Sequence, residues 1–486
     1  MKDRYQTIII GAGPAGMAAA MELSKAKKEF GLVEKADRVG GLSKTYTVQE
    51  GELIFRTDNG PHRFFSKNPY LYRFIEDLIQ DDWIQVRRQT RQYIAGTFLD
   101  YPINPSQVIR ALGWKMIFKA GWDYLKAVVT YQWLRRPVKN FYEYAISQFG
   151  RTLAMFNMIN YTEKIWGIST TDLHVDWAKQ RITGLNFGSL LKNVVTKWFS
   201  SSSSVKVKSL TDVFYYPRHG TGEIYQAIEK RLRANGYDIA VNTQPTKIRH
   251  DGKHILSIDL ESQGQIQTLT CENLVESIHL TDFVTLLDPL PPPEVLEAAR
   301  RLRYRSQIHL FVTLNKPSIT PDQWIYFPEQ KIPFARVSEM RNFSADMSPP
   351  GKTSWFIEFF CDETDPVYAM SKQELFALAL PSIEACGFFT AADVRETYLF
   401  RGQKDYPIYD THYEENLARV KEYMDRFENL YYIGRPGRFK YTNQDHSLEM
   451  GILAARSIIE GRRYDIEAVG SEKEYFEQGQ VPVKTS

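Results

Sequence analysis

The chain has 486 residues, a net charge of +3 and 43% hydrophobic residues. This length predicts two or three structural units, and the net charge from 61 basic and 58 acidic side chains is too small to argue for nucleic acid or an anionic membrane as a partner. Any anion-binding site must therefore be local. Cys271, Cys361 and Cys386 lack the CxxC spacing of a zinc site or a disulfide framework, which favours a reducing, cytoplasmic compartment. We expect no membrane-spanning helix, because no run approaches about 18 apolar residues, and no signal peptide, because a strand starts at once.

The first elements in chain order form a strand, a glycine turn, a helix and a second strand. Residues 7–10 are a short apolar run, residues 11–16 read Gly-Ala-Gly-Pro-Ala-Gly, residues 17–27 have a helical pattern, and residues 29–33 are again strand-like. This order is a βαβ unit with a GxGxxG sequence between strand and helix, which is the context that a dinucleotide-binding motif requires.

Each glycine of this motif has a physical task. Gly11 permits the tight turn, Gly13 lets the backbone approach a pyrophosphate, and Gly16 lets helix and strand pack closely. Glu34 ends the second strand, where its carboxylate can accept hydrogen bonds from both hydroxyls of an adenosine ribose, which favours FAD or NAD over NADP. The predicted cofactor-binding residues of this unit are Gly11, Gly13, Pro14, Ala15, Gly16, Glu34 and Lys35.

Later segments alternate between helical and strand-like patterns. Residues 104–197 have apolar residues at helical spacings and predict a helical subdomain, which five serines at 200–204 end. Short alternating runs between residues 238 and 280 predict a β-meander, and residues 308–360 are rich in strand signals. Residues 430–461 return to strand, turn and helix, as if the chain re-entered the first domain.

A second motif follows the first. Residues 38–42 read Arg-Val-Gly-Gly-Leu and resemble the segment that continues the glycine motif in flavoproteins of the amine oxidase, protoporphyrinogen oxidase and UDP-galactopyranose mutase superfamily. The resemblance implies that Arg38, Gly40, Gly41 and Leu42 lie along the phosphates and the ribityl chain of FAD. A nicotinamide dehydrogenase has no such segment, so FAD is the predicted cofactor.

Within that superfamily the chain resembles UDP-galactopyranose mutase, and more the longer eukaryotic type. The longest matching segment comprises residues 434–441, Gly-Arg-Pro-Gly-Arg-Phe-Lys-Tyr, and residues 443–447. The resemblance implies that Arg435 approaches both the flavin and a substrate diphosphate and that Tyr441 reaches the diphosphate. It also implies that FAD is held by Gly434, Arg435, Asn443, Gln444 and Ser447.

Four shorter segments also resemble the mutase. They begin at Tyr101-Pro102, at Trp166-Gly167, at Trp324-Ile325 and at Tyr406-Pro407. Read singly, each arginine in these segments is a surface ion pair, but several arginines and tyrosines together suit a diphosphate, because guanidinium groups bind phosphate oxygens bidentately. The substrate-binding residues that the resemblance implies are Tyr101, Asn104, Trp166, Arg181, Trp324, Tyr326, Arg336, Tyr406, Arg435 and Tyr441.

Residues 59–65 align with the family's histidine loop beside the flavin ring, which implies that Gly60, Pro61 and His62 contact the cofactor. The implied catalytic residues are His62, Arg336 and Arg435. Here Pro61 replaces the family's second glycine, and it has a fixed φ and no N–H to donate. The base-binding end also departs from the family, since Ile103, Thr162 and Phe343 replace the expected aromatic residue, asparagine and tyrosine. The base and the sugar therefore stay open.

The resemblance implies a mutase that interconverts the pyranose and furanose forms of a nucleotide-diphospho-sugar, with N5 of the reduced flavin attacking the anomeric carbon. The alternatives are an oxidoreductase of the amine oxidase or protoporphyrinogen oxidase type and a non-catalytic flavin-binding module. NAD(P)H is a candidate electron donor, and the oligomeric state stays open.

The fold class implied is α/β, with a discontinuous Rossmann-like FAD-binding domain, a helical subdomain and an antiparallel β-sheet substrate domain. The expected limits are 1–65, 205–290 and 395–468 for the FAD-binding domain, 104–204 for the helical subdomain, 66–103 and 291–394 for the substrate domain, and 469–486 for a flexible tail.

Overall fold

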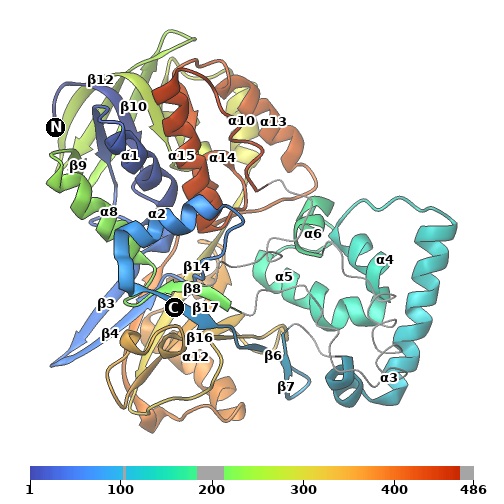
Figure 1. Ribbon diagram of the computed structural model, residues 1–486. Coiled ribbons are helices and arrows are strands. Elements are labelled where there is room, and N and C mark those ends of the chain that lie inside the picture. Colours follow the sequence, from blue (N-terminus) through green and yellow to red (C-terminus); the bar gives the residue numbers. More distant parts are fainter. Residues whose placement is uncertain (102–104, 183–212, 471–486) are drawn as a thin grey trace.

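The computed structural model describes residues 1–101, 105–182 and 213–470. Two sheets lie one above the other in Figure 1, and a group of helices stands to one side of them. This arrangement confirms the expected α/β fold with a Rossmann-like part, a second sheet and a helical part.

The first sheet has the strand order β13-β10-β11-β12-β1-β2-β9, and β20 pairs with β12. Strands β20, β12, β1, β2 and β9 are parallel neighbours. Ile8, Ile9, Leu32 and Val275 are fully buried on these strands, because helices cover both faces of the sheet. The strands are β1 (Arg4–Ile10), β2 (Phe30–Val33), β9 (Asp238–Ala240), β10 (Thr243–His250), β11 (Ile255–Ser262), β12 (Gln265–Glu276), β13 (Leu287–Asp288) and β20 (Leu430–Tyr432).

Two groups of helices enclose this sheet, one on each face. One face packs against α1 (Pro14–Lys25), α2 (Pro69–Ile79), α8 (Gly222–Ala234) and α15 (Gln444–Glu460). The other packs against α9 (Leu280–Phe283), α10 (Pro293–Arg301) and α13 (Tyr413–Met424). Helices α1 and α15 cross closely at Gly451, where an added Cβ would lie 2.0 Å from the Ala15 carbonyl oxygen.

The second sheet has the order β18-β14-β17-β16-β15-β6-β7, with β19 paired to β14. Its described pairs are antiparallel, except that β15 and β6 are parallel. Helix α12 (Lys372–Ala385) packs its apolar residues against this sheet, and α11 (Pro366–Ala369) precedes it. The strands are β6 (Thr90–Ile94), β7 (Thr97–Asp100), β14 (Tyr304–Leu314), β15 (Trp324–Tyr326), β16 (Arg336–Glu339), β17 (Thr353–Cys361), β18 (Val394–Arg401) and β19 (Tyr406–Pro407).

Two strand pairs connect the sheets. β3 (Thr45–Glu50) pairs with β4 (Leu53–Asp58), and β5 (Trp83–Arg87) pairs with β8 (Val213–Pro217). Among the described residues, no helix is both long and apolar enough to cross a membrane.

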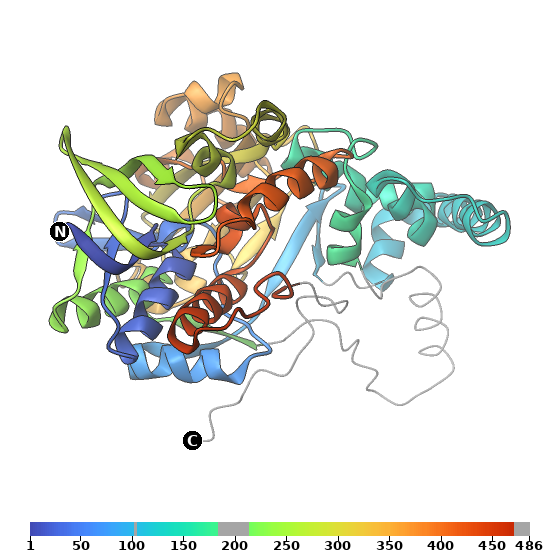
Figure 2. The same cartoon turned by 90° about the horizontal axis from the view of Figure 1, so that it is seen from above.

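The helical part extends sideways from the two sheets (Figure 2). Its helices are α3 (Pro105–Ala127), which continues as the π-helix η3 (Val128–Trp133), α4 (Phe141–Leu153), which continues as the π-helix η4 (Ala154–Ile159), α5 (Asn160–Trp166) and α6 (Val175–Ile182). Asn140 caps α4 by accepting a hydrogen bond from the Glu143 N–H. Gly150 has φ 70° in α4, and an added Cβ there would lie 2.6 Å from the Tyr124 nitrogen, so the approach of α3 to α4 requires glycine.

The structure corrects three of the expected domain limits. The limit at 395 divides β18, which pairs with β14 of the second sheet. Helix α2 and strand β5, expected in the substrate domain, bury Leu71, Ile75 and Trp83 with the helices of the first sheet, and α10 buries Val295 on its other face. In each case the apolar face of the element determines where it packs. The serines at 200–204 and the tail from residue 471 lie outside the described residues, and the other limits stay predictions.

Candidate functional site

A cavity of about 1320 Å³ lies between the two sheets and the helical part. Its floor is formed where β1, β2 and β12 end, because Ile10, Val33 and Ser277 line it. Ligands of open α/β sheets bind at such carboxyl ends. The volume exceeds the range of about 300–1,000 Å³ typical of small-molecule pockets, so an extended ligand can fit together with a second one.

The fold brings most of the predicted site residues to this one cavity. Those that line it are Gly11, Gly13, Pro14, Ala15, Glu34, Lys35, Gly41, Leu42, Gly60, Pro61, His62, Tyr101, Trp166, Trp324, Tyr326, Arg336, Tyr406, Gly434, Arg435, Tyr441, Asn443, Gln444 and Ser447.

The glycine turn forms a backbone cradle at one end of the cavity. Gly11 has φ 96°, and an added Cβ at Gly16 would lie 1.9 Å from the Gly11 carbonyl oxygen. An added Cβ at Gly41 would lie 2.9 Å from the Gly13 Cα. Among the described residues no side chain caps α1, and its first turn has no acidic residue, so its N–H groups are available to an anion. This cradle fits the pyrophosphate of a dinucleotide.

Glu34 lies beside the cradle with a fixed orientation. Its carboxylate accepts hydrogen bonds from the backbone N–H of Ala12 at 2.7 Å and of Ala36 at 2.8 Å. Because the carboxylate also lines the cavity, its remaining lone pairs face the position that ribose hydroxyls would take.

The opposite end of the cavity carries a buried ion pair. Arg336 on β16 donates from Nε and Nη2 to the two carboxylate oxygens of Glu358 on β17, and the Nη2 bond is 2.7 Å. The Glu358 side chain is fully buried, and that of Arg336 is 17% exposed. The carboxylate raises the pKa of Arg336 and outweighs burial, which lowers it. Arg336 therefore stays charged, with further N–H groups directed at the cavity.

A second arginine lies against two stacked tyrosines. Arg435 in α14 (Gly434–Arg438) lies 4.8 Å from the ring centroid of Tyr406 and 4.9 Å from that of Tyr441, and these rings stack at 5.7 Å. Its guanidinium donates to the backbone carbonyls of Thr442 and Asp405. Among the described residues no carboxylate forms an ion pair with it within 4 Å. The group suits an anionic ligand that approaches between the tyrosines.

Two titratable groups lie near these arginines: one is neutral at pH 7, and the other has a pKa close to 7. Burial, and then the charges of Arg435 and Arg336, lower the pKa of His62 to about 3, so its imidazole is neutral. Burial raises the pKa of Asp405 to about 7, against a lowering by Arg435. Both Asp405 carboxyl oxygens are buried without a hydrogen-bond partner among the described residues.

Aromatic rings form much of the remaining wall. Trp166, 2% exposed, meets Trp177 at 4.6 Å between ring centroids and Tyr406 at 6.2 Å. On the other side Tyr326 lies 5.3 Å from Tyr101 and 5.4 Å from Tyr161. Such a surface suits stacking on a ring or a sugar.

Some predicted residues lie elsewhere. Arg38 is half-exposed and pairs with Asp37 at 2.9 Å rather than lining the cavity, and Gly16 and Gly40 support the cradle from behind. Thr162 lines the cavity, whereas Phe343 packs against Trp324 in an apolar cluster. Asn104, Ile103 and the side chain of Arg181 lie outside the described part of the structure.

The structure adds cavity residues that the motifs did not single out. Lys44 lies beside the cradle, Tyr161 beside Tyr326, and Asp405 beside Arg435. Glu358 is a lone charge in the apolar run of β17, and this pattern alone indicates a buried acid with a fixed partner.

Comparisons with known proteins find similar proteins that have different activities. An L-amino-acid oxidase of Bothrops moojeni is 22% identical over 93% of this chain and 89% of its own. Among solved structures, reduced UDP-galactopyranose mutase has a TM-score of 0.80 at 22% identity, with 96% of each chain covered. A putative protoporphyrinogen oxidase from Exiguobacterium has a TM-score of 0.69 at 16% identity, with 95% of this chain and all of the other covered. At these identities the structural matches show the fold.

The family model of flavin-containing amine oxidoreductases matches residues 14–459, which is most of the chain. The flavin of this family fits the cradle at Gly11–Gly16, the oriented carboxylate of Glu34 and the size of the cavity. FAD is therefore the cofactor of this protein. The chain belongs to the family of flavin-containing amine oxidoreductases.

Proposed function

We propose that this flavoprotein is a nucleotide-diphospho-sugar mutase, which interconverts the pyranose and furanose forms of the sugar. One observation carries the proposal: Arg435 lies against the stacked rings of Tyr406 and Tyr441 without a carboxylate partner in the described structure, and Arg336 lines the same cavity. Two cations and two phenols suit a diphosphate better than they suit an uncharged or cationic amine.

The chemistry requires the anomeric C–O bond to break and to form again. The diphosphate leaves with the electron pair of that bond, and Arg336 and Arg435 neutralise the negative charge that it gains. Reduced flavin, when bound, supplies the electron pair that replaces the bond at the anomeric carbon. The aromatic wall orients the sugar and excludes water, which would otherwise hydrolyse it.

A second candidate is oxidation of an L-amino acid. The L-amino-acid oxidase relatives favour it, because an arginine can also bind the carboxylate of an amino acid. One carboxylate, however, would engage one of the two arginines. In this reaction the flavin must begin oxidised, whereas the mutase requires it reduced, so the redox state separates the candidates.

The deciding experiment uses a panel of nucleotide-diphospho-sugars with ¹⁸O in the bridge between the anomeric carbon and phosphorus. The FAD-bound protein is reduced with dithionite under anaerobic conditions, and an oxidised sample serves as control. We expect the label to move to non-bridging phosphate positions and furanose to form, in the reduced sample alone. A second arm offers L-amino acids to the oxidised protein and follows the flavin absorbance near 450 nm.

The outcomes distinguish the candidates. Migration of the ¹⁸O label together with interconversion of the pyranose and furanose forms supports the mutase. Absence of both with every nucleotide sugar, combined with flavin bleaching by an L-amino acid, overturns it in favour of the oxidase.

A further inference from the structure

The outer surface of α3 and of the first residues of η3 carries a row of exposed apolar side chains, here called the apolar stripe. They are separated by three or four residues and therefore share one side of the helix. Large exposed apolar patches are uncommon on proteins that remain free in water. The exposed fractions are 69% for Trp114, 77% for Phe118, 60% for Trp122, 57% for Leu125 and 43% for Val129.

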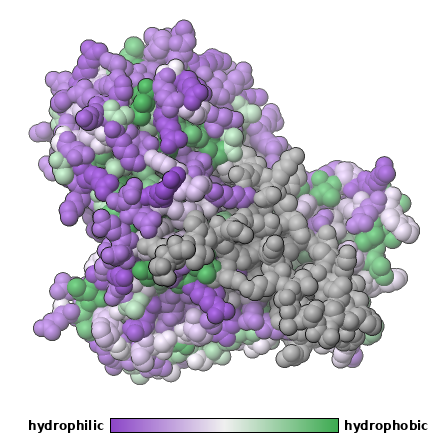
Figure 3. Space-filling model, viewed as in Figure 1, coloured by the Kyte–Doolittle hydropathy of each residue, from purple (hydrophilic) through white to green (hydrophobic). Residues whose placement is uncertain are grey.

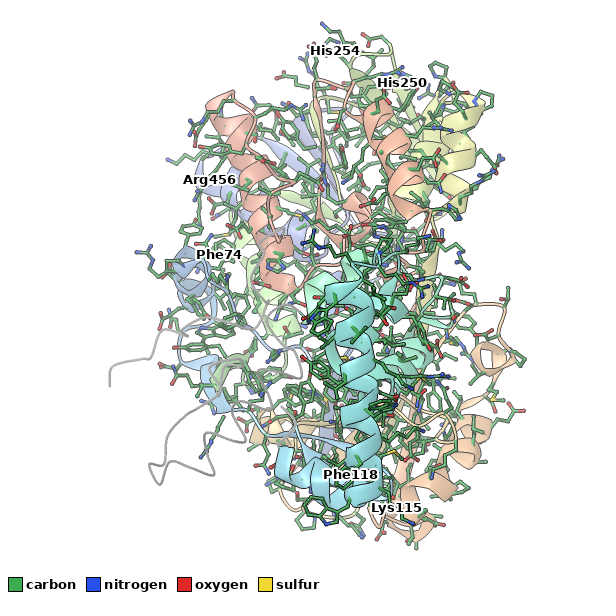
Figure 4. The ribbon with its side chains drawn as sticks, turned by 90° about the vertical axis from the view of Figure 1, so that its right-hand side faces the viewer. Phe74, Lys115, Phe118, His250, His254 and Arg456 are labelled. Atoms are coloured by element: carbon green, nitrogen blue, oxygen red, sulfur yellow. The ribbon has the colours of Figure 1, made fainter. Side chains whose placement is uncertain are left out.

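The stripe faces away from the rest of the described structure. Ala120 and Ala127 are 2% and 3% exposed and lie on the buried side of α3. Figure 4 looks onto α3 and labels Phe118 and Lys115 at the lower end of its long straight stretch, and Figure 3 shows hydrophobic side chains at the outer edge of the helical part. Trp133, the last residue of η3, and Leu134 after it are 77% and 74% exposed and extend the apolar surface.

The charged residues around the stripe are mostly basic. Lys115, Lys119 and Lys126 are exposed and follow the stripe along one edge at helical spacing, and the Lys126 Nζ lies 5.5 Å from the Trp122 ring centroid. The near-neutral net charge of the chain therefore conceals a basic segment. Between residues 105 and 139 the basic residues are Arg110, Lys115, Lys119, Lys126, Arg135, Arg136 and Lys139, and the acidic residue is Asp123.

We propose that α3 docks this protein on the surface of an anionic lipid bilayer. A helix with tryptophan, phenylalanine and leucine on one side and lysine beside them lies in the plane of the interface, with its apolar side in the acyl boundary. Tryptophan favours the headgroup level, and each lysine near anionic lipid adds to the attraction. This proposal does not depend on the sugar chemistry proposed above.

A second copy of the chain fits the stripe less well. A two-fold dimer would place the same basic patch on both partners. Asp123 is the one acidic residue between residues 105 and 139, and it already accepts a hydrogen bond from the Thr152 hydroxyl at 2.7 Å, so this segment of another copy offers the lysines a single carboxylate. Anionic headgroups provide the missing counter-charge.

The test uses the full-length, FAD-bound protein and vesicles of equal parts phosphatidylglycerol and phosphatidylcholine, with pure phosphatidylcholine vesicles beside them. Co-flotation measures binding, and quenching of tryptophan fluorescence by lipids brominated in the acyl chain measures insertion. Two variants are compared with wild type: Trp114→Ser, Phe118→Ser and Trp122→Ser combined, and Lys115→Glu, Lys119→Glu and Lys126→Glu combined. Ile266→Ser with Leu290→Ser, exposed apolar positions elsewhere, is the matched control.

We expect wild type and control to bind the anionic vesicles and to show quenching. The serine variant should lose at least about tenfold in partition coefficient, and the glutamate variant should lose the preference for anionic lipid. FAD content and circular dichroism verify folding, which these exposed positions should not change. Wild type that stays unbound with both vesicles overturns the proposal. So does self-association that sedimentation velocity detects in wild type and not in the serine variant, because the stripe would then be a contact between copies.

Discussion

The two ends of the cavity are built in different ways. At the cofactor end, backbone groups of one turn and one helix N-terminus form the surface, and Gly11, Gly16 and Gly41 are fixed by close contacts between main chains. At the substrate end, side chains form the surface, and Arg336 and Arg435 come from segments about a hundred residues apart.

This difference determines what a substitution does. A change at Gly16 or Gly41 of the cofactor end acts through the fold, because a new Cβ meets backbone that cannot move away. A change at Arg435 removes a charge from the cavity wall without breaking an ion pair, whereas a change in the buried Arg336–Glu358 pair also destabilises the fold. Loss of activity with FAD retained is therefore the signature of the substrate end, and loss of FAD is the signature of the cofactor end.

The largest expected effect is at Arg435. Arg435→Ala should lower kcat/KM for a nucleotide sugar on the order of 10³-fold, because a positioned donor to the leaving diphosphate is lost. The FAD content, measured from the ratio of absorbance near 450 nm to that at 280 nm, should stay the same. Arg435→Lys should recover part of the loss, since it keeps the charge but not the bidentate geometry.

The matched control for Arg435 is Arg233→Ala, which removes an exposed arginine from an i,i+4 pair with Glu229 outside the cavity. It should change neither activity nor FAD content. An Arg435→Ala protein that loses FAD but retains its binding affinity for the nucleotide sugar would place Arg435 at the cofactor end and contradict the contrast between the two ends.

The next effect concerns the ion pair of the substrate end. Glu358→Gln should lower the free energy of unfolding by about 3 kcal/mol, because it leaves the charge of Arg336 buried without a counter-charge. A nucleoside diphosphate such as UDP should raise the melting temperature of this variant more than that of wild type, since a phosphate can replace the carboxylate. Equal shifts in both proteins would mean that the diphosphate does not approach Arg336.

The sequence predicted the cofactor end better than the substrate end for a physical reason. Gly11, Gly13 and Gly16 act through local backbone geometry, so their spacing in one short segment indicates their function. Glu358 and Asp405 act through partners that only the folded chain brings near. Asp405 lies next to Tyr406, which the resemblance singled out, but nothing in the local pattern indicates that its carboxylate is buried where the charge of Arg435 lowers its pKa.

For the fold too, features that depend on local sequence were predicted better than features that depend on distant contacts. The βαβ order and the FAD cofactor follow from local signals, and both were predicted correctly. The expected limits at 66, 291 and 395 were wrong because α2, α10 and β18 pack according to their apolar faces, and the partners of those faces are distant in sequence.

A smaller effect is expected from two glycines of the same turn. Gly16→Ala should lower the free energy of unfolding by about 1–3 kcal/mol, because its Cβ would overlap the Gly11 carbonyl oxygen. Gly13 has φ −75°, and an added Cβ would lie 3.8 Å from the Gly41 Cα, an ordinary contact. Gly13→Ala should therefore keep the melting temperature of the FAD-free protein and weaken FAD binding about tenfold, equivalent to about 1.4 kcal/mol. Equal destabilisation by both alanines would mean that Gly13 has a packing role instead.

The smallest effect concerns Asp405, whose pKa burial raises to about 7 from about 3.9 in an unfolded chain. Between these values the folded protein binds more protons, so the contribution of Asp405 to the free energy of unfolding is complete below pH 4 and is lost as the pH rises through 7. Asp405→Asn should remove this pH dependence. The free energy of unfolding of the FAD-bound protein, measured by urea titration, should then change by less between pH 5 and 8, the difference from wild type being on the order of 1 kcal/mol. Some slope should remain, because burial raises the pKa of Asp58 into the same range. Asp77→Asn, at an exposed position, should leave the profile unchanged. A slope identical in Asp405→Asn and wild type would show that water reaches this carboxylate, and that the substrate end is less enclosed than the cofactor end.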